Sequence, residues 1–175
     1  ARLDAGRELR REEVDLVGLL VDTVADARAA GPDHDWRLDL AVLEPPADAT
    51  ADEAEDFLPE PPLVIGDEAH LRQVIVNLLA NARVHTPAGS HVTTTLARER
   101  DTLIVRIHDD GPGIAPDVRD SLFERFARGD SSRERRTGST GLGMSIALAI
   151  IQSHGGRIDV DSSTATEDHG TTFTV

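Results

Sequence analysis

Two asparagines one helical turn apart interrupt an otherwise apolar stretch, NLLANARVHTP at residues 77–87. The spacing of Asn77 and Asn81 places both amides on one side of a helix. A buried amide must be satisfied by hydrogen bonds. The pair is therefore either structural, bonded to a neighbouring loop, or it serves a ligand. The glycine-containing stretches further along the chain bear on that choice.

A first glycine motif, DDGPGIAPD at residues 109–117, directly follows a predicted strand. Gly111 and Gly113 allow the backbone to turn sharply there and to approach a ligand closely. An ordinary β-turn can carry the same letters. Taken alone, the motif therefore favours a ligand site no more than it favours a turn.

A second glycine motif, TGSTGLGMSIALAII at residues 137–151, places Gly138, Gly141 and Gly143 at the start of an apolar helix. The free N–H groups and the positive dipole end of a helix N-terminus form an anion site. Glycine before a helix is common, so this pattern is also only a moderate indication on its own.

A run of arginines lies between the two glycine motifs, in LFERFARGDSSRERR at residues 122–136. Phe123 and Phe126 stand three positions apart, and the basic residues that follow are Arg128, Arg133, Arg135 and Arg136. A solvated loop is one interpretation of this run. In an acidic chain, local neutralisation of bound phosphates is the sharper alternative.

The composition excludes several classes of function. The 175 residues suffice for one sizeable core, and the net charge of −14 disfavours nucleic acid and anionic membrane surfaces as partners. All 18 basic residues are Arg, and without Lys neither a P-loop nor a eukaryotic-type protein kinase is possible. The lack of Cys excludes disulfides and thiolate metal sites. No apolar run is long enough to cross a bilayer, so we expect a soluble piece of a longer protein.

Apolar periodicity predicts the elements that position these motifs. A helix is predicted over residues 14–30, where Gly31 and Pro32 end it, and a strand over residues 36–43. Residues 44–62 contain five prolines and seven acidic side chains, which predicts an exposed loop.

The helix that carries the asparagine pair is predicted over residues 68–84, capped by Asp67 and preceded by a short buried strand at 63–65. Its apolar stripe consists of Leu71, Val74, Ile75, Leu78 and Leu79. Further strands are predicted at 91–99, 102–109, 157–163 and 171–175, with a helix at 141–153. Helices interleaved with antiparallel strands predict a two-layer α/β sandwich.

Taken in order, the four motifs resemble the ATP-binding (catalytic) domain of bacterial two-component sensor histidine kinases, of the GHKL superfamily. The N-box is NLLANARVHTP, G1 is DDGPGI, the F-box is LFERFAR and G2 is GSTGLGM, and the resemblance extends from about residue 63 to the end. It implies the Bergerat fold shared with gyrase, MutL and the heat-shock chaperones. In that fold a mixed, mostly antiparallel sheet is backed by about three helices, and ATP lies between helices and a lid, here residues 115–140.

The resemblance also implies a role for each motif residue. Asp109 would accept a hydrogen bond from the adenine amine, Gly111 and Gly113 would admit the base, and Thr171 would lie beneath it. Asn81 would ligate Mg²⁺ through its amide oxygen, because a hard cation prefers oxygen. The residues implied to lie at the phosphates or the metal are Asn77, Arg128, Thr140, Gly141, Leu142 and Gly143.

The chain departs from the family pattern at three points. Val84 and His85 stand where the N-box usually has Lys and Tyr. Arg83 or a lid arginine would supply the missing charge, and His85 would bind nucleotide in place of tyrosine or is an inert surface residue. Ser139 replaces the second glycine of G2. None of the seven histidines is followed by the acidic residue, Arg and Pro of the acceptor motif, so the phospho-acceptor is expected outside this chain.

Position 77 distinguishes a kinase from a hydrolase. Hydrolytic relatives have a glutamate one turn before the metal-binding asparagine, where it activates water as a general base. Here that position is Asn77, which cannot take a proton, although Glu68 or Asp110 could stand in. We therefore expect a protein histidine kinase domain that binds Mg-ATP and donates the γ-phosphate to a histidine elsewhere. The alternatives are an anti-sigma-factor-type serine kinase and an inactive nucleotide-binding module.

The resemblance implies partners and a cellular setting as well. Residues 1–12 would be the end of the dimerisation helix and its linker, and residues 13–175 the ATP-binding domain. The partners would be the phospho-acceptor domain of the same kinase and a downstream response regulator. We expect a homodimer for the full-length protein, a monomer for this chain, and a place on the cytoplasmic side of a membrane-anchored sensor.

Overall fold

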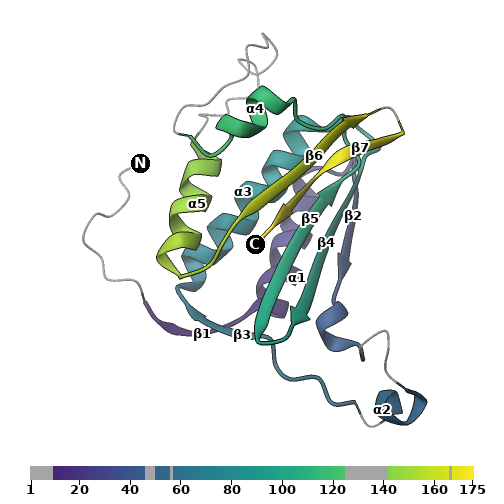
Figure 1. Ribbon diagram of the computed structural model, residues 1–175, viewed down its shortest axis with the longest axis vertical. Helices are drawn as coiled ribbons and strands as arrows, with labels where there is room; N and C mark the ends of the chain where they lie inside the picture. Colours follow the sequence, from purple (N-terminus) through teal and green to yellow (C-terminus); the bar gives the residue numbers. More distant parts are fainter. Residues whose placement is uncertain (1–9, 46–49, 56, 125–141, 166) are drawn as a thin grey trace.

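The computed structural model describes residues 10–45, 50–55, 57–124, 142–165 and 167–175. These residues form two layers, a five-stranded sheet and three helices that cover one of its faces (Figure 1). The strand order is β2-β4-β5-β7-β6, and only the β2–β4 pair is parallel. The strands are β2 (Asp35–Asp39), β4 (His91–Glu99), β5 (Thr102–Asp109), β6 (Asp159–Ala165) and β7 (Asp168–Thr174). The covering helices are α1 (Leu16–Ala30), α3 (Glu68–His85) and α5 (Gly143–Ser153). The predicted two-layer α/β sandwich is confirmed.

The β4–β5 hairpin has the bounds that the alternating pattern predicts. Its inward face is apolar, with Val92 and Leu96 from β4 and Val105 and Ile107 from β5 all buried. The tight turn between the strands puts Arg100 at φ 55°, in the left-handed region. Alternation is strong here because one face packs on the helices and the other meets solvent.

Helix α3 begins at its predicted residue and ends at His85, one residue later than expected. Asp67 caps it, with its carboxylate accepting the His70 backbone N–H at 3.2 Å. The Asp67 backbone N–H in turn donates to His154 Nε2 at 3.0 Å, and His154 is the residue that follows α5. The start of α3 is therefore joined to the end of α5.

Helix α1 is shorter than predicted, because Val14 and Asp15 belong to a strand, β1 (Glu12–Asp15). This strand pairs antiparallel with β3 (Leu63–Gly66) in a separate two-stranded sheet. Asp15 then caps α1 by accepting the Val17 N–H at 2.9 Å. The apolar helical periodicity continues unbroken through Val14. The pairing of Val14 with Val64 of the distant strand β3 therefore decides the conformation of this residue.

The prediction that β3 is buried is wrong. Leu63 and Ile65 are 43% and 60% exposed, whereas Val64 between them packs against the core. A two-stranded ribbon buries one face only, which leaves the other face of β3 in solvent.

Three further bounds differ from the predictions. Strand β2 ends at Asp39, because residues 41–43 form a 3-10 helix that turns Val42 into the core. The acidic segment predicted as a loop contains a short helix, α2 (Ala51–Glu55). The predicted lid begins with helix α4 (Pro116–Ser121), which has Pro116 at its first position.

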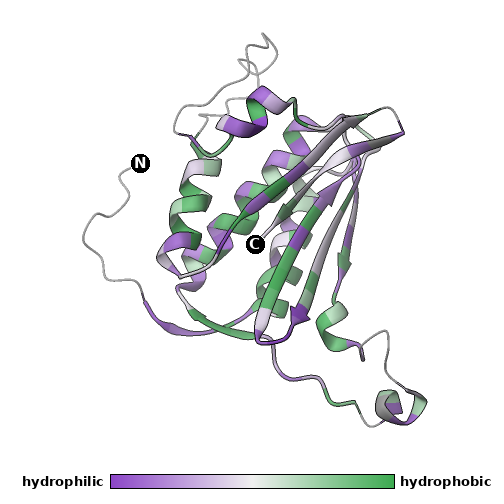
Figure 2. Ribbon diagram, in the orientation of Figure 1, coloured by the Kyte–Doolittle hydropathy of each residue, from purple (hydrophilic) through white to green (hydrophobic). Residues whose placement is uncertain are grey.

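Helix α5 supplies much of the apolar layer beneath the sheet. It begins at Gly143 rather than at the predicted residue 141, and it is largely hydrophobic (Figure 2). Met144, Ala147, Ile150 and Ile151 are its buried residues. Within the described residues, no helix has the length and apolar character needed to cross a membrane.

Candidate functional site

One row of side chains crosses the whole sheet on the face that meets the helices. The strand register places its members directly opposite one another, and such residues project to the same face. The row consists of Trp36, Val92, Asp109, Thr171 and Ser162, from β2, β4, β5, β7 and β6 respectively. It is therefore apolar over two strands and polar over three, and the polar part contains the predicted Asp109 and Thr171.

Asp109 is a buried carboxylate with one oxygen already engaged. The residue is 4% exposed, and its Oδ1 accepts the Gly111 backbone N–H at 3.0 Å. Burial raises the pKa of Asp109 above its ordinary value, and the Gly111 hydrogen bond opposes that change only in part. Its Oδ2 has no hydrogen-bond partner within the described residues and can accept from a ligand.

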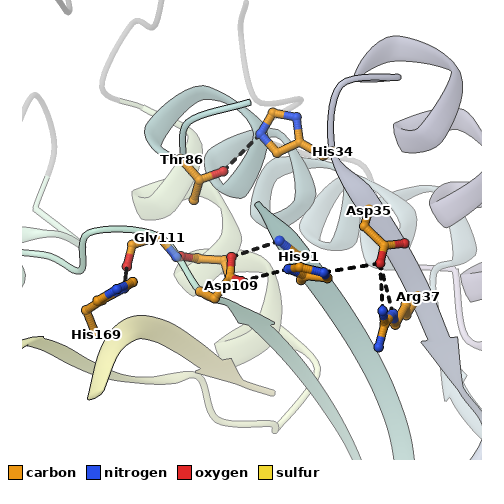
Figure 3. A network of polar contacts seen from close by, with 9 residues as sticks. His34, Asp35, Arg37, Thr86, His91, Asp109, Gly111 and His169 are labelled. Atoms are coloured by element: carbon orange, nitrogen blue, oxygen red, sulfur yellow. Dashed lines mark hydrogen bonds and ion pairs between the residues drawn. The ribbon is translucent and has the colours of Figure 1, made fainter. Parts of the chain in front are cut away.

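The G1 loop after Asp109 is fastened to the β6–β7 hairpin. The Ile114 N–H donates to Ser162 Oγ at 2.8 Å, and His169 Nδ1 donates to the Gly111 carbonyl at 2.8 Å (Figure 3). Gly113 has φ +75°, and a Cβ at this position would collide with the Ser163 carbonyl oxygen. Both the backbone conformation and the close approach therefore require glycine.

The sequence analysis missed Ser162. Besides the Ile114 N–H, its hydroxyl contacts the Gly170 carbonyl and Thr171 Oγ1, each at 2.9 Å. Serine on a strand carries no signal of such a role, and these partners come from two other segments of the chain. Only the register of β6 against β7 reveals it.

The N-box and G2 meet at the other side of the site. Asn77 Nδ2 donates to the Gly143 carbonyl at 3.1 Å, which joins α3 to the first residue of α5, just after Leu142. Asn81, one turn along α3, is half-buried and makes no side-chain hydrogen bond within the described residues. The two amides therefore differ, because one already serves the structure and the other remains free for a ligand.

His85 and Arg83 lie on different sides of α3. His85 is exposed at the end of the helix, close enough to Asp109 for a positive charge on its ring to lower the pKa of that carboxyl. Arg83 packs its side-chain carbons next to Gly31, at the α1–β2 connection. Two helical residues differ by about 200° in direction, so Arg83 points away from Asn81. The prediction that Arg83 could replace the family's lysine is therefore wrong.

Two acidic residues, Glu68 and Asp110, were predicted as possible substitutes for the missing base. Glu68 precedes Asn77 by nine residues on α3, about 13 Å along the helix axis, and forms an ion pair with Arg72. Asp110 accepts the His91 backbone N–H and contacts His91 Nδ1, both at 2.8 Å. These two carboxylates therefore belong to other contacts.

The remaining predicted phosphate residues, Arg128, Thr140 and Gly141, fall outside the described residues. Of the F-box, Leu122 and Phe123 are half-buried against the core.

A cavity of about 340 Å³ lies at the opposite end of the helices, and none of the predicted site residues lines it. Its walls are mainly apolar, with Leu16, Val74, Ile151 and Val175 among them. A nucleotide needs several polar partners, so the candidate site is the polar region around Asp109, not this cavity.

Comparison with known proteins places the chain and its fold in a family. The family of histidine kinase-, DNA gyrase B-, and HSP90-like ATPases matches residues 66–175. The probable sensor histidine kinase TcrY of Mycobacterium tuberculosis is 48% identical over 163 residues, 93% of this chain and 31% of the relative.

Solved structures agree with this match. The mycobacterial sensor histidine kinase MprB superposes with a TM-score of 0.72 at 26% identity, over 94% of each chain. Histidine kinase ThkA, solved in complex with the response regulator protein TrrA, has the same fold, with a TM-score of 0.67 at 20% identity over 97% of this chain and 42% of that one. The chain spans about a third of the length of the curated relatives it matches. It belongs to the histidine kinase-, DNA gyrase B-, and HSP90-like ATPase family, as an ATP-binding domain of the sensor histidine kinase type.

Proposed function

We propose that this chain binds Mg-ATP and donates the γ-phosphate to a histidine on the dimerisation domain of a sensor kinase. The observation that carries the proposal is the buried Asp109 carboxylate, which holds the Gly111 N–H with one oxygen and leaves the other unpaired. The unpaired oxygen is not among the fully buried atoms that lack a partner, so a ligand that supplies a donor can reach it. The exocyclic amine of adenine is such a donor.

The base would enter over the polar part of the row, where Asp109 and Thr171 lie side by side. Gly111 and Gly113 support this assignment, because their backbone is held against Asp109 and the β6–β7 hairpin and leaves no side chain in the way. His85 and Leu142 would border the nucleotide from the ends of α3 and α5. Arg128, Thr140 and Gly141 remain predicted phosphate contacts.

Asn81 suits the Mg²⁺ that accompanies ATP. Its amide oxygen is the type of ligand that this cation accepts, and the side chain has no hydrogen bond within the described residues. When bound, Mg²⁺ neutralises charge on the phosphate oxygens. Asn77 would lie close to the same phosphates, since it holds the Gly143 carbonyl at the start of α5.

The N-box supports transfer to a protein rather than to water. Asn77 cannot accept a proton, and the carboxylates of Glu68 and Asp110 are paired with Arg72 and His91. The γ-phosphate is therefore retained until an acceptor arrives. We propose that this acceptor is a histidine of the dimerisation helices of the same kinase, and that residues 1–12 lead from them into residues 13–175.

A response regulator is the downstream partner we propose. Its support is the complex of ThkA with the response regulator protein TrrA, a kinase that shares this fold. We propose that the full-length protein is a homodimer through its dimerisation helices and that this chain alone is a monomer.

The test combines binding with transfer of label from γ-labelled ATP. The chain alone should bind Mg-ATP in calorimetry yet release almost no phosphate and incorporate no label. Dimerisation helices that carry the acceptor histidine, added in trans, should then become labelled, because proximity makes the stored nucleotide a phosphoryl donor. The label should be lost in acid, as expected for phosphohistidine.

Other outcomes would each contradict a different part of the proposal. Rapid ATP hydrolysis by the chain alone would overturn the argument from Asn77. Acid-stable labelling of a partner would favour a serine kinase. Binding without any transfer, even with the helices present, would indicate an inactive nucleotide-binding module.

A further inference from the structure

We propose that Ser162 is a positioning residue of the base site: it fixes the direction of hydrogen bonding in Thr171, so that the site selects an amino group at purine C6 over a carbonyl. This inference deepens the proposed ATP function and rests on it. Ser162 is half-buried on β6 and lies outside the motifs of the N-box, G1 and G2.

Three contacts determine where the hydroxyl protons lie. The Gly170 carbonyl at 2.9 Å can only accept, so the Ser162 proton points to it. The Ile114 N–H at 2.8 Å can only donate, so it occupies one lone pair of Ser162 Oγ. Thr171 Oγ1, also at 2.9 Å, must then donate its proton to the second lone pair. A serine hydroxyl has one donor and two acceptor positions, and all three are used.

The proton of Thr171 is therefore unavailable to a ligand. Thr171 lies directly opposite Asp109 on the β5–β7 pair, on the same face, and both are buried. Two neighbouring groups, the Asp109 carboxylate and the Thr171 hydroxyl oxygen, thus both offer lone pairs. An amino group at C6 has two N–H donors for such a pair, whereas a carbonyl oxygen at C6 would face acceptors only.

The experiment compares ATP with inosine 5′-triphosphate, which has a carbonyl in place of the amino group at C6. Calorimetry with Mg²⁺ present should show that the unmodified chain prefers ATP strongly. In Ser162→Ala, Thr171 is free to rotate and donate to the carbonyl. We expect the ratio of ATP to inosine triphosphate affinity to fall by about tenfold, the size expected for one hydrogen bond. Ser162→Thr, which keeps the hydroxyl, should restore the ratio.

A matched control is Ser163→Ala, the neighbouring position on the opposite face of β6. Within the described residues, the Ser163 hydroxyl accepts the Ala165 N–H at 3.2 Å and makes no hydrogen bond to Ile114 or Thr171. Its removal should change neither affinity. A second test is Thr171→Val, which should lower the ratio by itself, and adding Ser162→Ala to it should lower the ratio no further.

The outcomes separate the two proposals. If the unmodified chain binds neither nucleotide, the proposed function itself fails. If it binds ATP but Ser162→Ala weakens both nucleotides equally, or neither, Ser162 has no role in base selection and the inference is wrong. Should Ser162→Ala fail to fold, Ser162→Cys must show the fall in the ratio, because a thiol is a weak donor and acceptor. An unchanged ratio in Ser162→Cys would equally overturn the inference.

Discussion

The two halves of the candidate site are built differently. On the base side, Asp109, Gly111, Ile114, Thr171 and Ser162 are hydrogen-bonded to one another or to the adjacent strand without any ligand. On the phosphate side the described residues contribute one such contact, from Asn77 to Gly143, while Asn81 has none there. The base side is therefore held together by hydrogen bonds within the protein, whereas Asn81, among the described residues of the phosphate side, has no such bond.

We expect this difference to separate two tasks, the selection of the base and the transfer of the phosphoryl group. A rigid set of donors and acceptors discriminates between bases, because a wrong base leaves buried groups unpaired. Groups without protein partners can instead follow a phosphate and its metal as they change during the reaction. Variants on each side of the candidate site test this division.

Asp109→Asn should have the largest effect, which is on ATP binding. The amide can still accept the Gly111 N–H through its oxygen, but it then directs an NH₂ group at the amine of adenine. ATP affinity should fall by about a hundredfold, as expected when two donors face each other in a buried site. Calorimetry and thermal melts check this result. An unchanged ATP affinity would mean that the base does not bind at Asp109.

Two glycine substitutions compare the halves directly through the free energy of unfolding. Gly113→Ala should cost about 2 kcal/mol, because φ +75° disfavours a side chain and a Cβ collides with the Ser163 carbonyl. Gly143→Ala should change stability by less than about 0.5 kcal/mol, since a Cβ there lies 3.7 Å or more from Asn77. Urea unfolding measures both. Equal costs would contradict the view that the chain is packed more tightly around Gly113 than around Gly143.

Substitutions of the two asparagines should have different effects, one on stability and the other on metal binding. Asn77→Ala should cost about 1 kcal/mol of stability, through loss of its bond to the Gly143 carbonyl. Asn81→Ala should leave stability unchanged and weaken Mg-ATP about tenfold, an effect of about 1.4 kcal/mol, without weakening adenosine. Melting and calorimetry on both variants test this pair. If Asn81→Ala lowers adenosine affinity equally, Asn81 does not act through the metal.

The smallest effect concerns pH and follows from the raised pKa of Asp109. A carboxyl whose pKa is higher in the folded state contributes stability below its unfolded pKa, and that contribution is lost as pH rises through the folded value. Asn cannot ionise. The difference in unfolding free energy between Asp109→Asn and the unmodified chain should therefore favour the variant more at pH 7 than at about pH 4. Urea unfolding at both values, with Asp110→Asn as a neighbouring control, would detect the difference. A difference of opposite sign would mean that the folded state favours the ionised carboxylate.

Elements whose pattern is complete within one segment were predictable from the sequence. The β4–β5 hairpin shows strict alternation, and α3 combines a cap at Asp67 with a regular apolar stripe, so both were found almost to the residue. Strand β1 could not be found this way, because Val14 continues the apolar period of α1 and becomes a strand only by pairing with Val64.

The same limit applies to the site. Asp109, Asn81 and the glycines were predicted as site residues because each belongs to a short motif. Ser162 belongs to none, and its partners are Ile114, 48 residues before it, and the strand that follows it. The direction of Arg83, by contrast, could have been predicted from helical geometry. Arg83 lies two residues after Asn81, and residues at this spacing project from nearly opposite sides of a helix.

The fastened G1 loop has a consequence for inhibitors. Because hydrogen bonds within the protein hold Gly111 and Ile114 to the β6–β7 hairpin, a small fragment that binds there need not order the loop. Fragments bind with high efficiency per atom where the protein pays no ordering entropy. A bare aminopurine should therefore be a usable starting point for chemistry, to be extended toward the ends of α3 and α5.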